Sequence, residues 1–465
     1  MNALEFARMQ FGITTLFHFI FVPLSIGLAF FVALCHTRYY RTGEERWRTA
    51  TRFWGKLMLI SFAIGVVTGI VQEFQFGMNW SDYSRYVGDV FGAPLAMEGL
   101  MAFFLESTFI GLWIFGWGRL KPKVHLATAW LVSIGTMLSA YFILAANSWM
   151  QHPVGYEFNQ VTGRAEMTNI FDVLTNSTAL YAIPHTIFGA LATGAMVVAG
   201  ISAYHLLRKR DIEVFKPSIA MALPIVLVAT IITAGVGHFQ GVLLEEQQPM
   251  KMAAAEALWE TDSGVGLSVF ALSHFEQNPG HTNVNWQIPK LLSLISTNSP
   301  NGTVRGMDEV QEEYRAKYGP GEYVPIVAVT YWSFRAMIGS GVAMILLTLF
   351  GLFLARRNRL LDTRWYLKLL PIAAVLPFIA NLTGWVFTEL GRQPWVVQGL
   401  LKTSDAVSPS VSSGEVLLTM VGYTLLYGIL AIVGGVLFMR TVKSGPAAHE
   451  SETEAPGTDH LAIAY

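Results

Sequence analysis

The sequence predicts an all-α polytopic membrane protein with nine transmembrane helices. Hydrophobic residues make up 53% of the 465 residues, charged residues make up only 14%, and the mean hydropathy is +0.44. Soluble domains carry about 25% charged residues. Apolar segments are also long: between Arg8 and Arg38, the only charged or histidine residues are His18 and His36. Because a helix needs about 20 apolar residues to cross the hydrocarbon core, such segments favour membrane spans over a large soluble core.

Nine segments reach this length. We expect each to be a helix, because lipid offers no partner for unpaired backbone groups. The first segment is too long for a signal peptide and has no small-residue cleavage site, so we count it as a true span. The segments are roughly 13–36, 54–72, 93–117, 125–147, 178–206, 218–238, 324–354, 367–388 and 416–439.

Lysine and arginine are distributed unevenly between the connections. The connections after the first, third, fifth and seventh segments are rich in them, and so is the start of the tail, whereas the short alternate connections carry almost none. By the positive-inside rule, the N-terminus is outside and the C-terminus is cytoplasmic, as an odd number of spans requires. The basic residues are Arg38, Arg41, Arg46, Arg48, Arg52, Lys56, Arg119, Lys121, Lys123, Arg208, Lys209, Arg210, Lys216, Arg356, Arg357, Arg359, Arg364, Lys368, Arg440 and Lys443.

These patterns divide the chain into four parts. Residues 1–238 hold helices 1–6, residues 239–323 form a long extracytoplasmic loop between helices 6 and 7, residues 324–440 hold helices 7–9, and residues 441–465 form a disordered cytoplasmic tail. A loop of this length is usually functional or disordered. It contains a helix-like stretch at Met307–Tyr318 and a turn-rich stretch at Gln277–Asn285. The tail is polar and low in apolar residues, which is typical of disorder.

Several classes of protein are excluded. Cys35 is the only cysteine, so the chain has no intrachain disulfide, no CxxCH haem attachment and no iron–sulfur ligand set. The sequence has no GxxxxGK[ST] phosphate loop, which argues against an ATP-driven pump.

Seven ionisable or soft-donor side chains lie within or at the ends of apolar segments: His18, Glu98, Glu106, His185, Arg335, Met337 and Glu389. An ionisable group at membrane depth costs several kcal/mol unless a partner accepts it. The predicted topology directs all seven toward the outer face, and histidine, methionine and carboxylate side chains are metal ligands, so we interpret the set as a haem-iron site.

On a continuous α-helix, Glu106 would lie about 12 Å deeper in the membrane than Glu98. Their spacing of eight residues gives about 80° of rotation on an α-helix, so they share a flank only loosely.

Each residue also has a simpler interpretation. An isolated histidine near a helix end is often interfacial, methionine often fills gaps in a core, and Glu389 could pair with Arg392. If none of the seven residues belonged to a site, each simpler interpretation would have to hold independently of the others.

Two other functions remain open at this point. A di-haem b cytochrome needs four histidines on facing helices, and a secondary carrier predicts broken helices and no pigment.

The predicted outer loop suggests a substrate. The stretch Gln247–Lys251 precedes a helix-like run at Met252–Trp259, which contains Glu256. Lys251 and Glu256 could hold a quinol head group by hydrogen bonds and accept its proton. An exposed, salt-bridged helix explains the spacing equally well.

Four ordered motifs resemble subunit I of the cytochrome bd-type quinol oxidases. They are GAPLAMEGLMAFFLES (Gly92–Ser107), QPMKMAAAE (Gln248–Glu256), YWSFRAM (Tyr331–Met337) and GRQPW (Gly391–Trp395). The resemblance covers the chain except the tail. The outer loop of about 85 residues resembles the short-loop branch of the family.

The resemblance implies a nine-helix subunit with two b-type haems, one low-spin and one high-spin, and one haem d. It implies that membrane quinol is oxidised and dioxygen is reduced to water, which generates a proton gradient without pumping. The implied location is the cell membrane of a prokaryote, within the lipid bilayer. The implied partner is a second membrane subunit, subunit II, with room for a small accessory subunit and no role for nucleic acid.

The resemblance also implies residue roles. His185 and Met337 resemble the ligands of the low-spin b haem, with Arg335 beside it. His18 and Glu389 resemble the axial ligands of the high-spin b haem and haem d, and which residue binds which haem stays open. Glu98 resembles a further acid at that di-haem site, and Glu106 resembles a proton-path acid. Lys251 and Glu256 resemble the quinol-binding pair. Trp385 resembles an aromatic near the haems, and Arg392 resembles a site arginine.

Overall fold

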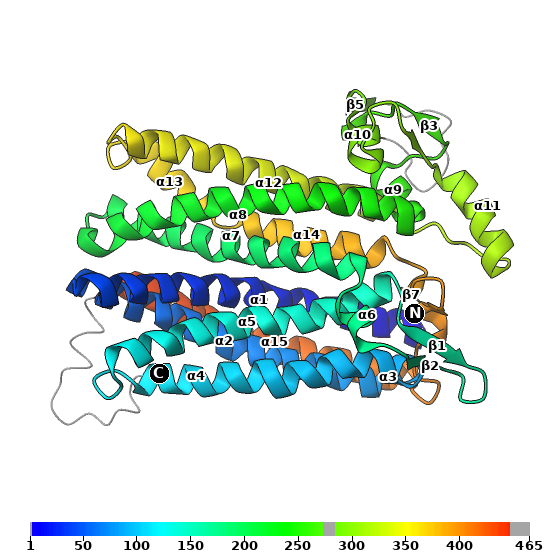
Figure 1. Cartoon of the computed structure of the whole chain (residues 1–465), viewed down its shortest axis with the longest axis horizontal. Helices are drawn as coiled ribbons and strands as arrows, with labels where there is room; N and C mark the ends of the chain where they lie inside the picture. Colours follow the sequence, from blue (N-terminus) through cyan, green and yellow to red (C-terminus); the bar gives the residue numbers. More distant parts are fainter. Residues whose placement is uncertain (1, 273–283, 447–465) are drawn as a thin grey trace.

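The computed structural model describes residues 2–272 and 284–446, and in this part nine helical spans are long and apolar enough to cross a membrane. They run side by side as one elongated bundle (Figure 1). The number of spans predicted from the sequence is confirmed. The spans are α1 (Ala3–Thr42), α2 (Glu45–Met78), α3 to α4 (Ser81–Phe115), α5 (Pro122–Gln151), α7 (Ser177–Leu207), α8 (Ile212–Gln247), α12 (Val327–Arg356), α13 to α14 (Arg364–Leu390) and α15 (Ser413–Ser444).

Most helices extend beyond the apolar segments, and at α1 capping groups define both ends. At the start of α1, the Asn2 side chain accepts a hydrogen bond from the Glu5 backbone, and the Glu5 side chain accepts one from the Asn2 backbone. This capping box satisfies two backbone donors that the helix leaves free. Gly43 ends α1 in the left-handed conformation, with φ 67°. Helix α15 continues to Ser444, so the predicted tail begins later than residue 441; residues 447–465 lie outside the described residues.

The short elements gather at one end of the bundle, which we call the loop end (Figure 1). The connections rich in lysine and arginine lie at the other end. All four described sheets are antiparallel pairs: β1–β2, β3–β6, β4–β5 and β7–β8. The loop-end elements are β1 (Tyr156–Asn159), β2 (Arg164–Met167), α6 (Ile170–Leu174), α9 (Pro249–Glu256), β3 (Asp262–Ser263), β4 (Leu267–Leu272), β5 (Val284–Ile288), α10 (Leu291–Thr297), β6 (Thr303–Val304), α11 (Met307–Tyr318), β7 (Trp395–Val397), β8 (Leu401–Lys402) and a 3₁₀ turn (Thr403–Asp405).

The long loop is largely structured. The helix predicted at Met307–Tyr318 is confirmed as α11. The run predicted at Met252–Trp259 is instead α9, which begins at Pro249 and ends at Glu256. It begins early because proline is well tolerated in a first helical turn, and it ends where Ala257 turns left-handed, with φ 51°. Most of the predicted turn-rich stretch Gln277–Asn285 lies outside the described residues.

Two spans are interrupted. Glu98–Phe103 forms a π turn between α3 and α4. The segment predicted at 367–388 is two helices, α13 (Arg364–Ala373) and α14 (Leu376–Leu390). The break lies just before Pro377, which has no N–H to donate and whose ring crowds the carbonyl four residues earlier. Broken helices alone therefore do not distinguish a carrier from a haem protein.

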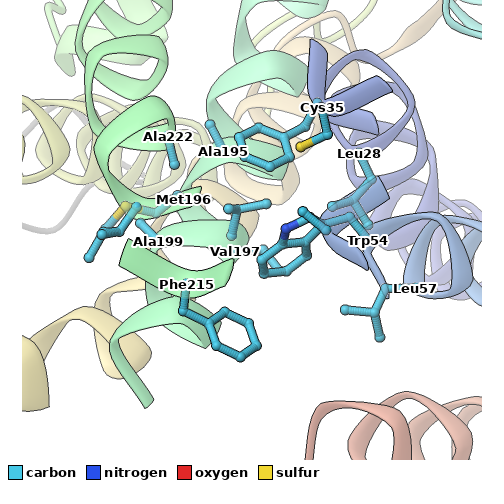
Figure 2. Packing of buried hydrophobic residues seen from close by; sticks show 14 of the residues in the cluster. Leu28, Cys35, Trp54, Leu57, Ala195, Met196, Val197, Ala199, Phe215 and Ala222 are labelled. Atoms are coloured by element: carbon cyan, nitrogen blue, oxygen red, sulfur yellow. The ribbon is translucent and has the colours of Figure 1, made fainter. Parts of the chain in front are cut away.

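Helix α7 is the most buried span and lies at the centre of the core. A Cβ on Gly27 of α1 would lie 2.2 Å from the Ala190 carbonyl oxygen of α7. The backbones of Gly194 and Gly27 are in direct contact. Small residues allow helices in a membrane to approach this closely. Figure 2 shows the adjoining core, where Trp54 of α2 and Phe215 of α8 pack near α7. This packing fixes α7, and therefore His185, relative to α1 and α8.

Candidate haem and quinol site

His18 is held by a neighbouring helix through one ring nitrogen. Its Nδ1 lies 2.9 Å from Oγ1 of Thr68 in α2. The Thr68 hydroxyl is 2.9 Å from the Ile64 carbonyl, to which it donates its own proton, so it accepts from His18. His18 Nδ1 therefore carries the hydrogen, and Nε2 keeps a free lone pair. A Cβ on Gly69 would lie 3.1 Å from the Cε1 atom of His18, so the glycine leaves room beside the ring.

His185 follows the same arrangement on α7. Its Nδ1 lies 3.0 Å from the backbone carbonyl oxygen of Thr233 in α8. A carbonyl only accepts, so Nδ1 donates and Nε2 is available as a ligand. Gly237 lies beside the ring, where a Cβ would be 3.3 Å from Cε1. Haem and metal ligands are commonly oriented in this way, by a hydrogen bond from the other ring nitrogen.

Met337 lies at a depth similar to that of His185. The two residues are about 15 Å and 12 Å from the loop-end starts of α12 and α7, respectively. Both helices pack against α8. Gly384 of α14 faces the methionine, and a Cβ there would lie 2.9 Å from Sδ. The thioether thus has a small-residue neighbour, as the two histidines do.

Glu98 and Glu106 face the same helix, in contrast to the loose relation expected from their spacing. Ser139 of α5 donates to Glu98 Oε1 at 2.7 Å, and a Cβ on Gly135 of α5 would lie 2.8 Å from Glu106 Cγ. Ser139 and Gly135 are one helical turn apart on one face. The physical reason is the π turn at Glu98–Phe103, because its extra residue rotates everything after it back by about 100°. The expected 80° offset is therefore nearly cancelled.

Glu389 is surrounded by polar groups at the loop end. Its Oε1 accepts from Asn147 Nδ2 at 2.9 Å and from Gln151 Nε2 at 3.4 Å, both on α5. Its Oε2 pairs with Arg392, so the simpler interpretation of an Arg392 partner also holds. The Arg392 side chain is only 2% exposed. Trp385 is half-buried on α14, four residues before Glu389.

Lys251 belongs to the Glu389 cluster. It is 4% exposed, and its Nζ donates to Gln151 Oε1 at 2.7 Å. Burial, together with the nearby positive charge of Arg392, lowers the pKa of Lys251 to about 7, although Glu389 opposes the shift. Lys251 and Arg392 also line a cavity of about 10 Å³, which has room for roughly one water.

Glu256 points away from Lys251, because five residues on a helix turn by about 140°. Its Oε2 lies 2.6 Å from Arg335 Nη2, in a pair whose side chains are 2% and 9% exposed, respectively. Arg335 also donates to the Ser268 carbonyl at 3.0 Å and to the Ala255 carbonyl. Burial raises the pKa of Glu256, and Arg335 counteracts the shift. The donors of Arg335 are thus directed to the loop, whereas the resemblance implied a position beside the low-spin b haem.

Several polar residues at the site were not predicted. Thr68, Ser139, Asn147 and Gln151 each hold a predicted site residue. Asn147 and Gln151 are four residues apart, which places them on one face of α5. This spacing is the only signal that the sequence carries for them, and it is common near helix ends.

Comparison with known proteins decides which family has this arrangement. The family model for cytochrome bd terminal oxidase subunit I matches residues 6–446. The chain belongs to this family. Membership makes it a membrane-embedded subunit of a terminal respiratory oxidase, and a cytochrome of this kind uses haem and works with a second subunit.

Individual relatives agree over nearly the whole chain. The cytochrome bd ubiquinol oxidase subunit 1 of Bacillus subtilis (strain 168) is 49% identical over 456 residues, covering 98% of this chain and 97% of the relative. The cytochrome bd-II ubiquinol oxidase subunit 1 of Escherichia coli (strain K12) is 37% identical, covering 97% and 98%. The structure of bd oxidase from Geobacillus thermodenitrificans matches with a TM-score of 0.87 and 27% identity, covering 96% of this chain and 99% of that one.

Proposed function

We propose that this bd oxidase subunit I oxidises membrane quinol and carries two b-type haems and one haem d for the reduction of dioxygen to water. One observation carries the proposal: His18 and His185 both have Nδ1 fixed by a neighbouring helix, which leaves Nε2 of each for iron. An imidazole held through Nδ1 in this way presents Nε2 to a metal.

The donor chemistry supports specific ligands. His185 and Met337 form the set that saturates a low-spin b haem and suits electron transfer. His18 and Glu389 serve the high-spin b haem and haem d, in an order that the residues leave open. Bound haem supplies one-electron transfer and, where an iron position is open, a place for dioxygen.

The quinol-facing residues have separate tasks in this proposal. Glu256 Oε1 is buried and has no hydrogen-bond partner among the described residues, so it is the group that accepts a quinol hydroxyl proton. Arg335 holds the other oxygen of that carboxylate in place. Lys251, on the opposite side of α9, donates to a quinol oxygen or to water bridging to it.

Protons for water formation come from the other side of the membrane. Glu106 and Glu98 lie along one face of α5 and form a path inward, with Glu106 Oε1 buried and unpartnered among the described residues. The basic connections lie at the end opposite the loop end, which supports a cytoplasmic location for that end. Quinol oxidation at the outer face and proton uptake from the cytoplasm together generate a gradient without pumping.

We further propose a complex in a prokaryotic cell membrane with subunit II and a small accessory subunit. Relatives named for ubiquinol and for menaquinol both match this chain, so the quinol class fits either head group. The alignment with the E. coli relative spans 507 positions, more than the 465 residues here, so that relative has insertions that this chain lacks. A shorter chain of this kind is what the short-loop branch predicts.

The test is a reduced-minus-oxidised spectrum, haem extraction and quinol-dependent oxygen uptake of the purified complex. We expect three haems per chain, one of them a chlorin with a far-red band. A complex that takes up oxygen with quinol but lacks the far-red band would refute haem d. A pigment-free complex without oxygen uptake would refute the whole proposal.

A further inference from the structure

One buried amide, that of Gln151, joins the outer loop to the candidate haem ligand. Gln151 is the last residue of α5 and is 4% exposed. Its Oε1 accepts from Lys251 Nζ at 2.7 Å and from Gln248 Nε2 at 3.1 Å. Its Nε2 donates to Glu389 Oε1 at 3.4 Å. Three segments that are distant in sequence therefore meet at one side chain.

The amide has only one sensible orientation. An ammonium group donates and does not accept, so the carbonyl oxygen of Gln151 must face Lys251. A carboxylate accepts, so the NH₂ group must face Glu389. Reversing the amide would place NH₂ against a cation and the carbonyl against an anion. The side chain thus lies between a positive and a negative group with each end matched in polarity.

Neighbouring residues hold Gln151 in this position. Gln248 Nε2 also donates to the Gln151 backbone carbonyl at 2.5 Å, so the loop is hydrogen-bonded to the backbone of Gln151 as well as to its side chain. Asn147, one turn earlier on α5, makes the shorter contact to the same Glu389 oxygen. Among the described residues, Gln151 is the hydrogen-bond partner of the Lys251 ammonium. A movement of α9 can therefore be transmitted to Glu389 through this residue.

We propose that Gln151 is a positioning residue that couples Lys251 of the quinol-binding loop to Glu389 of the haem site. The inference rests on the proposed function, because it takes Lys251 as a quinol-binding group and Glu389 as a haem ligand. It assigns to one amide two roles: fixing the Lys251 ammonium for quinol, and setting the hydrogen-bond donation that Glu389 receives. Donation to a ligand carboxylate tunes the metal that the carboxylate holds.

Gln151→Leu and Gln151→Glu separate the two roles. Leucine removes both contacts, whereas glutamate keeps an acceptor for Lys251 but places a like charge at Glu389. Gln247→Leu is the matched control, since its amide lies at the same end of the bundle and bonds Thr178 and Ser177, not Lys251. All variants are made in the full complex.

The measurements are the quinol KM, kcat and the reduced-minus-oxidised haem spectrum with the midpoint potentials. We expect Gln151→Leu to raise KM by roughly tenfold or more, as loss of a bond to a charged group implies, and to alter the signal of the haem held by Glu389. We expect Gln151→Glu to keep a KM near that of the parent while altering the same haem signal. Gln247→Leu should change neither.

Two outcomes would overturn the inference. One is a Gln151→Leu variant with parental KM and haem spectrum. The other is a Gln151→Glu variant that keeps the parental haem signal, because a repelled Glu389 must respond if the contact matters. Failure of the proposed function is distinguishable, since it would be seen in the parent complex as missing haems or missing quinol oxidation.

Discussion

The buried ion pair between Arg335 and Glu256 makes a sharp prediction for Arg335→Gln. Arg335 lies on α12, and its partners Glu256, Ala255 and Ser268 all belong to the outer loop. The guanidinium carbon also lies 3.9 Å from the ring centroid of Tyr331. We therefore expect the substitution to release α9 and β4 from the bundle more often than in the parent.

The size of the effect follows from burial. The side chains of the pair are 9% and 2% exposed, so solvent screens them little. Removing one partner of a buried pair costs about 3–5 kcal/mol, because the remaining charge stays buried without compensation. The lower figure corresponds to a rise of about 100-fold in the population of the open loop. Glutamine retains some hydrogen bonding, so the lower figure is the appropriate one.

Limited proteolysis of the loop in native membranes measures this population, provided that opening and closing are fast relative to cleavage. We expect cleavage about 100-fold faster for Arg335→Gln. The double variant with Glu256→Gln should recover much of the protection, because both charges are then absent. A parental cleavage rate for Arg335→Gln, or a double variant no better protected than the single one, would refute the reasoning.

Three further predictions concern separate parts of the site. Met337→Leu should convert the low-spin haem to high spin, seen by electron paramagnetic resonance, and an unchanged low-spin signal would remove Met337 as a ligand. Because burial raises the pKa of Glu256, there is a pH range above about 4.5 in which the closed loop still holds a proton that the open loop has lost; above that range, Glu256 is the carboxylate that pairs with Arg335. Loop protection, measured by proteolysis, should therefore fall as the pH rises from 4.5 through the pKa of the closed state, and Glu256→Gln should abolish that dependence. Gly135→Ala should displace Glu106, whose Cγ would lie 2.8 Å from the added Cβ, together with Leu105 at 2.7 Å, and should slow oxygen reduction in stopped-flow measurements. The control Gly111→Ala has open space and should be silent; equal rates for the two variants would contradict the path.

Much of the site could be predicted because charge and metal-ligand chemistry are rare in apolar segments. His18, His185 and Glu389 stand out for that reason alone. Their supporting residues do not stand out. Thr68 and Gln151 are ordinary polar residues in sequence, and only the packing of α1 on α2, and of α5 on the loop, gives them a role.

The sequence alone determined the class of protein, the nine spans found in the described residues and the candidate site residues, because burial in lipid permits only long apolar helices and penalises every stray charge. The tertiary structure decided how those residues are grouped. It turned Glu98 and Glu106 to one face through a π turn, separated Lys251 from Glu256 and directed Arg335 to the loop. These relations depend on helix phase and on contacts between distant segments, neither of which the local pattern of residues encodes.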